Sequence, residues 1–153
     1  DIDPFLKKFN EKFYFTLERS VKFYKWRIDR YPLGEKKYFI KKNQNNISSI
    51  LISQILNNKA LIVDLLSDDA DESITMIKNF LNYCKSNEIL NIKFCTSNKT
   101  LIGKINKEIN CKFNKFESFI YIKSLINEGV IERELLDKNE TYETYVSGDV
   151  LIR

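Results

Sequence analysis

Apolar residues form an almost continuous run at 60–66, ALIVDLL, and this pattern is typical of a strand that is buried on both faces. The two stretches before it, 36–42 and 47–56, are rich in aromatic and β-branched residues. Polar turns, NQNN and NNK, separate the three stretches. The first half of the chain is therefore predicted to contain three antiparallel strands joined by hairpin turns.

The clearest helical pattern covers 68–88, where acidic residues precede an apolar face. Residues at helical spacing form that face: Ile74, Ile77, Phe80, Leu81 and Cys84. Asp3 and Pro4 are typical of a helix start. The other predicted elements are helices at 19–29 and 98–109, strands at 12–18, 91–97 and 116–125, and turns at Gly129 and at 148–149.

This order of elements predicts an α/β fold with a mixed, mostly antiparallel central sheet and helices on both faces. We expect 60–66 to be the central strand, flanked by 47–56 and 91–97, with the 68–88 helix packed across it. No repeat or low-complexity linker divides the sequence, so residues 1–153 are predicted to form a single domain. Because the sequence does not begin with Met, we expect it to be part of a longer or tandem protein.

The composition narrows the classes of function. Hydrophobic residues make up 43% and charged residues 30% of the chain, which is ordinary for a globular protein. No apolar run approaches the roughly 20 residues that span a bilayer, so no membrane span is expected. The net charge of +4 is carried by scattered lysines, so nucleic-acid binding is possible but not favoured.

The chain contains no His, and this excludes nucleophile systems of the Ser-His-Asp and Cys-His kinds. Its three cysteines, Cys84, Cys95 and Cys111, are widely spaced and odd in number. We therefore expect free thiols packed in the core, a cytoplasmic location and no metal site.

The stretch RSVKFYKWRIDRYP resembles a pattern of acyltransferase-like proteins from bacterial surface-polysaccharide clusters. These proteins belong to the GCN5-related N-acetyltransferase (GNAT) superfamily. The residues that match are Arg19, Phe23, Trp26, Arg27 and Pro32, and the segments LIVDLL and YETYVSGD are similar to two later landmarks. The resemblance implies a GNAT-like fold that transfers an acyl group from acetyl-CoA or another acyl-CoA to an amine or amino sugar.

One segment departs from the family pattern. GNAT enzymes have a glycine-containing loop before the helix that meets the pyrophosphate of the cofactor, whereas residues 67–72 read Ser-Asp-Asp-Ala-Asp-Glu. Carboxylates there would satisfy the helix N-terminus themselves and repel a diphosphate. The alternative is therefore a degenerate, non-catalytic GNAT module that binds a ligand or a partner domain, such as a second domain of the same protein. A nucleic-acid adaptor is the third and weakest interpretation.

Three residues are candidates from the chemistry of the chain: Asp64, Trp26 and Arg27. Asp64 interrupts an apolar strand, so it is either a general base or the buried partner of Arg27 or of a backbone N–H group. Trp26 either closes the core at a helix end or forms a wall of a substrate pocket. We expect Trp26 to be mostly buried and Arg27 to engage a carboxylate, with Asp64 the first candidate and Asp149 the second.

The resemblance implies the remaining candidate site residues. Trp26, Arg27 and Tyr31 are assigned to the binding of the acceptor substrate. Leu66, Ser67 and Asn98 are assigned to the binding of the acyl-CoA cofactor.

Overall fold

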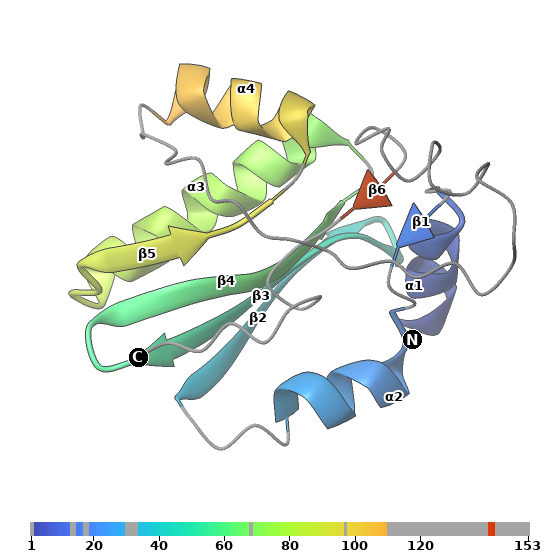
Figure 1. Ribbon diagram of the computed structural model, residues 1–153, viewed down its shortest axis with the longest axis horizontal. Coiled ribbons are helices and arrows are strands. Elements are labelled where there is room, and N and C mark those ends of the chain that lie inside the picture. Colours follow the sequence, from blue (N-terminus) through green and yellow to red (C-terminus); the bar gives the residue numbers. More distant parts are fainter. Residues whose placement is uncertain are drawn as a thin grey trace, which may run out of the picture.

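A computed structural model of the chain describes residues 2–12, 15–16, 19–29, 34–67, 69–96, 98–109 and 141–142. Its central element is a four-stranded sheet with the strand order β2-β3-β4-β5 (Figure 1). Neighbouring strands run antiparallel, except that β5 runs parallel to β4. The strands are β2 (Glu35–Asn43), β3 (Asn46–Leu56), β4 (Lys59–Ser67) and β5 (Asn91–Phe94).

Tight connections hold the first three strands in register. Asn57 adopts a left-handed backbone conformation with φ of 55° in the turn between β3 and β4, and its short amide side chain tolerates that conformation. Gly34 precedes β2 with φ of 75°, and a Cβ atom there would lie only 2.5 Å from the carbonyl oxygen of Ile55. Glycine is therefore required where the chain enters the sheet.

Helices cover both faces of the sheet (Figure 1). On one face lie α1 (Asp3–Asn10), α2 (Val21–Tyr24) and the π-helical turn η1 (Lys25–Asp29). On the other lie α3 (Ala70–Ser86) and α4 (Lys99–Glu108). Successive side chains of β3 point to opposite faces of the sheet and so contribute to both hydrophobic cores. Ile50 and Ile52 pack with α1 and α2, whereas Leu51 packs with α3.

The apolar stripe predicted for the long helix is the core of the α3 layer. Phe80 is completely buried, and its ring meets the ring of Phe39 from β2 edge-on at a centroid distance of 5.4 Å. Asp69 precedes the helix as its N-cap and accepts a hydrogen bond of 2.7 Å from the backbone N–H of Glu72. The helix therefore begins where a carboxylate is available to cap it.

Two β-bulges interrupt the regular alternation of the strands. The pairing of β3 with β4 passes from Ile52 opposite Asp64 to Ser53 opposite Ile62, so that Val63 is the extra residue of β4. A second shift places an extra residue, Ser48, in β3 opposite β2. A bulge moves the residues beyond it to the opposite face of the sheet.

The structure confirms the main predictions for the fold. The chain forms an α/β structure with a mostly antiparallel sheet, and 60–66 lies in a central strand between β3 and β5 with α3 packed on it. Of the predicted strand 12–18, the structure describes Phe15–Thr16 as β1, which pairs in parallel with β6 (Thr141–Tyr142). The strand at 116–125 and the turns at Gly129 and 148–149 lie outside the described residues, and the single domain over 1–153 stays a prediction.

Replacing the most deeply buried aromatic residue tests this packing. We expect Phe80→Ala to lower the free energy of unfolding by about 3–5 kcal/mol, because it leaves a large cavity between β2 and α3. Urea unfolding followed by circular dichroism measures the loss. Asn82→Ala, an exposed position of the same helix, is the matched control and should change the stability by less than about 0.5 kcal/mol. Equal effects of the two substitutions would contradict the packing described for α3.

Candidate functional site

A buried ion pair lies between the sheet and the helices of the α1/α2 face. Arg19 donates a hydrogen bond of 2.8 Å from Nε to Oδ2 of Asp64, and neither side chain is exposed to solvent. The hydroxyl of Tyr24 donates a second bond of 2.9 Å to the same oxygen. The backbone N–H of Leu65 donates to Oδ1 at 3.0 Å. A buried carboxylate with several donors, one of them charged, is well satisfied.

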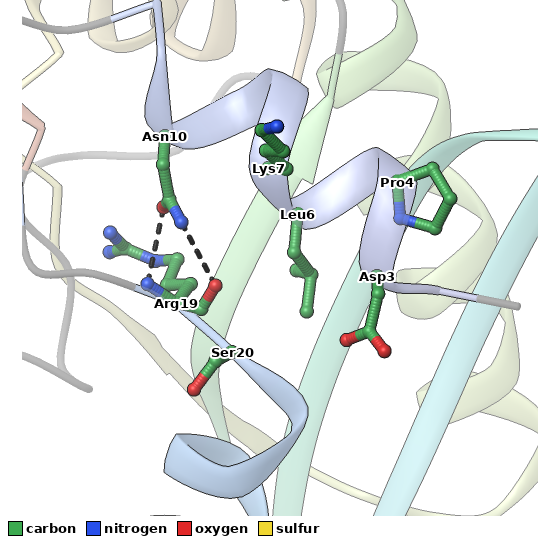
Figure 2. Close-up of a pocket in the computed structure, with 7 residues that line it drawn as sticks. All are labelled: Asp3, Pro4, Leu6, Lys7, Asn10, Arg19 and Ser20. Atoms are coloured by element: carbon green, nitrogen blue, oxygen red, sulfur yellow. Dashed lines mark hydrogen bonds between the residues drawn. The ribbon is translucent and has the colours of Figure 1, made fainter.

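Local structure places each member of this network. Figure 2 shows Asn10, at the end of α1, donating to the backbone oxygen of Arg19 at 2.9 Å and accepting from its backbone N–H at 3.1 Å. Ser20 caps α2 by accepting from the N–H of Phe23 at 3.1 Å. On the sheet side, the bulge at Val63 directs Asp64 towards α2. Two helix ends and one bulge therefore converge on a single carboxylate.

Asp64 was assigned two alternative roles, and this geometry favours the second. It is enclosed and bonded to an arginine and a tyrosine, so its carboxylate has no exposed surface on which to meet a substrate. Asp64 forms an ion pair with Arg19, whereas the sequence indicated Asp64 as the first candidate partner of Arg27. Arg19 lies in the same motif and was not assigned to the site. The sequence did contain a feature that could have indicated Arg19, because three of the five arginines of the chain lie between 19 and 30.

Trp26 is 61% exposed, so the prediction that it is mostly buried is wrong. The reason is the π-helical turn at Lys25–Asp29, which widens the helix and changes the spacing of its faces. Tyr24 and Ile28 occupy the buried positions, while the Trp26 ring lies at the surface 6.1 Å from the ring of Phe23. Arg27 is half-buried, and Tyr31 lies outside the described residues.

The residues assigned to a cofactor lie at the ends of β4 and before α4. Leu66 is completely buried on the α1/α2 face and has no surface to offer. The hydroxyl of Ser67 contacts the hydroxyl of Ser73 and the backbone oxygen of Asp69. Asn98 caps α4 by accepting from the N–H of Leu101 at 3.0 Å. All three side chains therefore have structural roles.

The acidic N-terminus of α3 is neutralised by its neighbours. Glu72 accepts a hydrogen bond of 2.8 Å from Lys41 on β2 and one of 2.6 Å from the hydroxyl of Ser49 on β3. These two donors hold the pKa of the Glu72 carboxyl below its usual range. Asp71 pairs with Lys104 of α4 at 2.5 Å. The carboxylates of Glu72 and Asp71 thus bind lysines of neighbouring elements, while that of Asp69 caps the helix.

A shallow hollow of about 480 Å³ opens beside the start of α1 and the Arg19–Ser20 segment (Figure 2). Its lining combines one acidic residue, two basic residues, two uncharged polar residues and two apolar residues: Asp3, Lys7, Arg19, Asn10, Ser20, Pro4 and Leu6. None of the predicted site residues lines it. The hollow is therefore a different place from the one that the sequence indicated.

The part of the chain that the structure describes contains no reactive thiolate, metal-binding cluster or membrane-spanning helix. Burial raises the pKa of the Cys84 thiol to about 11 and also raises that of Cys95, so neither is a ready thiolate. Among the described residues, no three acidic or sulfur side chains gather as a metal site. None of the described helices is long and apolar enough to cross a bilayer.

Comparison of the chain with protein-family models, with curated proteins and with solved structures found no match. The resemblance to GNAT proteins therefore remains a prediction from the sequence.

The buried ion pair should dominate the stability of the α1/α2 face. We expect Arg19→Met to cost about 3–5 kcal/mol, because it leaves the Asp64 carboxylate buried without its cation. The double variant Arg19→Met/Asp64→Leu should recover much of this loss, since both charges are then removed. Urea unfolding of the two variants gives the comparison.

Arg27→Met is the matched control for this cycle, because Arg27 is half-buried in the same segment. It should cost about 1 kcal/mol or less. If Arg27→Met destabilised the chain as strongly as Arg19→Met, the assignment of the buried pair would be wrong.

The lowered pKa of Glu72 predicts a dependence of stability on pH. A carboxyl whose pKa is lower in the folded than in the unfolded chain stabilises the fold above the unfolded value, about 4.3, and this stabilisation is lost as the pH falls through the folded value. We expect Glu72→Gln to cost on the order of 1 kcal/mol at pH 7, and the difference from the natural chain should shrink at about pH 3. Urea unfolding at both pH values tests this. The exposed Glu88→Gln should show no such convergence, and a difference for Glu72→Gln that stays constant with pH would contradict the argument.

Proposed function

We propose that this chain is a GNAT-like module that binds a partner and does not itself transfer acyl groups from acetyl-CoA. The observation that carries the proposal is the buried Arg19–Asp64–Tyr24 network. It uses Asp64, the residue that the sequence indicated as a candidate general base, to join α2 to the sheet. A base must come within hydrogen-bond reach of the substrate proton, and an enclosed carboxylate cannot do so.

The N-terminus of α3 gives independent support. A diphosphate binds such a terminus through free backbone N–H groups and a positive helix end. Here the side chain of Asp69 takes the N–H of Glu72, and the carboxylates of Asp71 and Glu72 face lysines of neighbouring elements. These residues do not fit the pyrophosphate of a CoA.

The second candidate is an acyltransferase that acts on an amine or amino sugar of a surface glycan in the cytoplasm. The observation in its favour is that β4 pairs with β5 only over Lys59–Ile62, while β4 continues to Ser67. Beyond Ile62 no other described strand covers that side of β4. An extended acyl donor could contact this edge without using the helix terminus, and the exposed Trp26 could pack against a sugar acceptor.

Titration with acetyl-CoA separates the two candidates. We expect isothermal titration of the intact chain to show no saturable binding, with any Kd weaker than about 1 mM, because the helix terminus is already capped. A saturable Kd in the micromolar range would overturn the proposal and favour the acyltransferase. Ser67→Arg is the matched variant for that outcome: it should abolish binding that occurs at the open end of β4 and leave binding elsewhere unchanged.

A further inference from the structure

The outward face of α2 and η1 carries an exposed tryptophan that the buried network does not use. Tyr24 and Ile28 are the buried residues of this segment, so they define the side that packs on the sheet. Trp26 lies midway between them in sequence, and helical geometry therefore turns its side chain to the opposite side. The ring of Phe23 lies 6.1 Å from that of Trp26. Figure 1 shows α2 at the periphery of the molecule, where this aromatic pair can meet an external surface.

Two lysines accompany Trp26 on this face. Lys22 lies one helical turn before Trp26, and Lys25 directly precedes it. Both side chains are exposed, and neither forms an ion pair among the residues that the structure describes. By contrast, Lys78 of α3 is paired with Glu108 of α4. The positive charge beside Trp26 is therefore available to an external anion.

Exposed side chains of β2 lie beside this face. The hydroxyl of Tyr38 donates to Asp29, so this bond joins β2 to η1 and engages the one acidic residue of η1. Tyr38 and Ile40 are 45% and 49% exposed, and strand alternation places them on the same side of β2. Of the four large hydrophobic residues that are exposed in the described part of the chain, three thus lie on η1 and β2.

This combination suits the surface of an anionic bilayer. Tryptophan and tyrosine have an apolar ring with a polar edge, and they are enriched at the level of the lipid headgroups. Lysines beside such a face are attracted to acidic headgroups. Single-stranded nucleic acid fits less well, because the aliphatic side chain of Ile40 offers no ring on which a base can stack. A protein partner would need a surface shaped to both a helical turn and a strand, whereas a fluid bilayer adapts to them.

We propose that α2, η1 and the exposed side of β2 bind the surface of a membrane that contains anionic lipids. Trp26 would enter the headgroup region, Tyr38 and Ile40 would lie against it, and Lys22 and Lys25 would meet the acidic headgroups. The contact is peripheral, and no element of the chain crosses the bilayer in it. This inference goes beyond the proposed function and does not depend on it, because the capped terminus of α3 lies on the other face of the sheet.

Trp26 is the only tryptophan of the chain, so its fluorescence reports the contact directly. The probe is a vesicle of phosphatidylcholine that contains about one-third phosphatidylserine. We expect the emission of the intact chain to shift to shorter wavelength when these vesicles are added, because the indole leaves water. Vesicles of phosphatidylcholine alone should cause little shift, and added salt should reverse the shift by screening the lysines.

Sedimentation with the same vesicles measures the affinity of variants. Lys25→Glu should weaken binding about tenfold or more, because attraction to the headgroups becomes repulsion. Trp26→Ser should weaken it by a similar factor of about ten, because the interfacial ring is lost. Lys85→Glu makes the same change of charge at an exposed position of α3, and Leu90→Ser removes an exposed apolar residue next to β5. Both of these matched controls should bind as the natural chain does.

Several results would overturn the proposal. One is the absence of both a spectral shift and sedimentation with the anionic vesicles, and another is equal binding to vesicles of phosphatidylcholine alone. An equal loss in Lys25→Glu and Lys85→Glu would assign the effect to the charge of the whole molecule. A spectral shift with a single-stranded oligonucleotide and none with vesicles would make nucleic acid the occupant. The acetyl-CoA titration is independent, since micromolar CoA binding removes the proposed function alone, whereas failure to bind vesicles removes this inference alone.

Discussion

A buried ion pair between Arg19 and Asp64 joins the N-terminal helices to the central strand of the sheet. Removing two charges from water costs several kcal/mol, and only close geometry and further hydrogen bonds offset that cost. The structure supplies both, since Tyr24 donates to the same carboxylate and the ring of Phe9 lies 5.9 Å from the guanidinium. Asn10 then fixes the backbone of Arg19. The α1/α2 layer is therefore organised around one carboxylate as much as around its apolar core.

The bulge at Val63 makes this arrangement possible. In regular alternation, Asp64 would share a face with Ile62 and point into the apolar layer under α3. The extra residue reverses the phase, so that Asp64 faces α2 while Leu65 packs in the α3 layer. A single insertion thus decides whether this carboxylate is an unpaired charge in a hydrophobic core or the centre of a satisfied network. The same bulge coincides with the end of the pairing between β4 and β5.

Charge is distributed differently on the two sides of this sheet. Around the N-terminus of α3, acids and lysines from separate elements neutralise one another, as the Glu72–Lys41 and Asp71–Lys104 pairs show. On the other face of β2, the side chains of Tyr38 and Ile40 are exposed. The first arrangement occupies the helix N-terminus at which an anion would otherwise bind.

Local pattern alone determined the strand and helix order, because period-two and helical spacing of apolar residues reflect which faces are buried. The central position of 60–66 and the core face of α3 followed from the same spacing. Only the tertiary structure decided that Arg19 binds Asp64 and that Trp26 lies at the surface. Residues distant in sequence compete for one buried carboxylate, and a bulge or a π-helical turn shifts the phase of a face by one residue. Neither the choice of ion-pair partner nor the shift of a face produces a periodic pattern of residues in the sequence. The partner of Asp64 and the exposure of Trp26 therefore followed only from the packing of the elements.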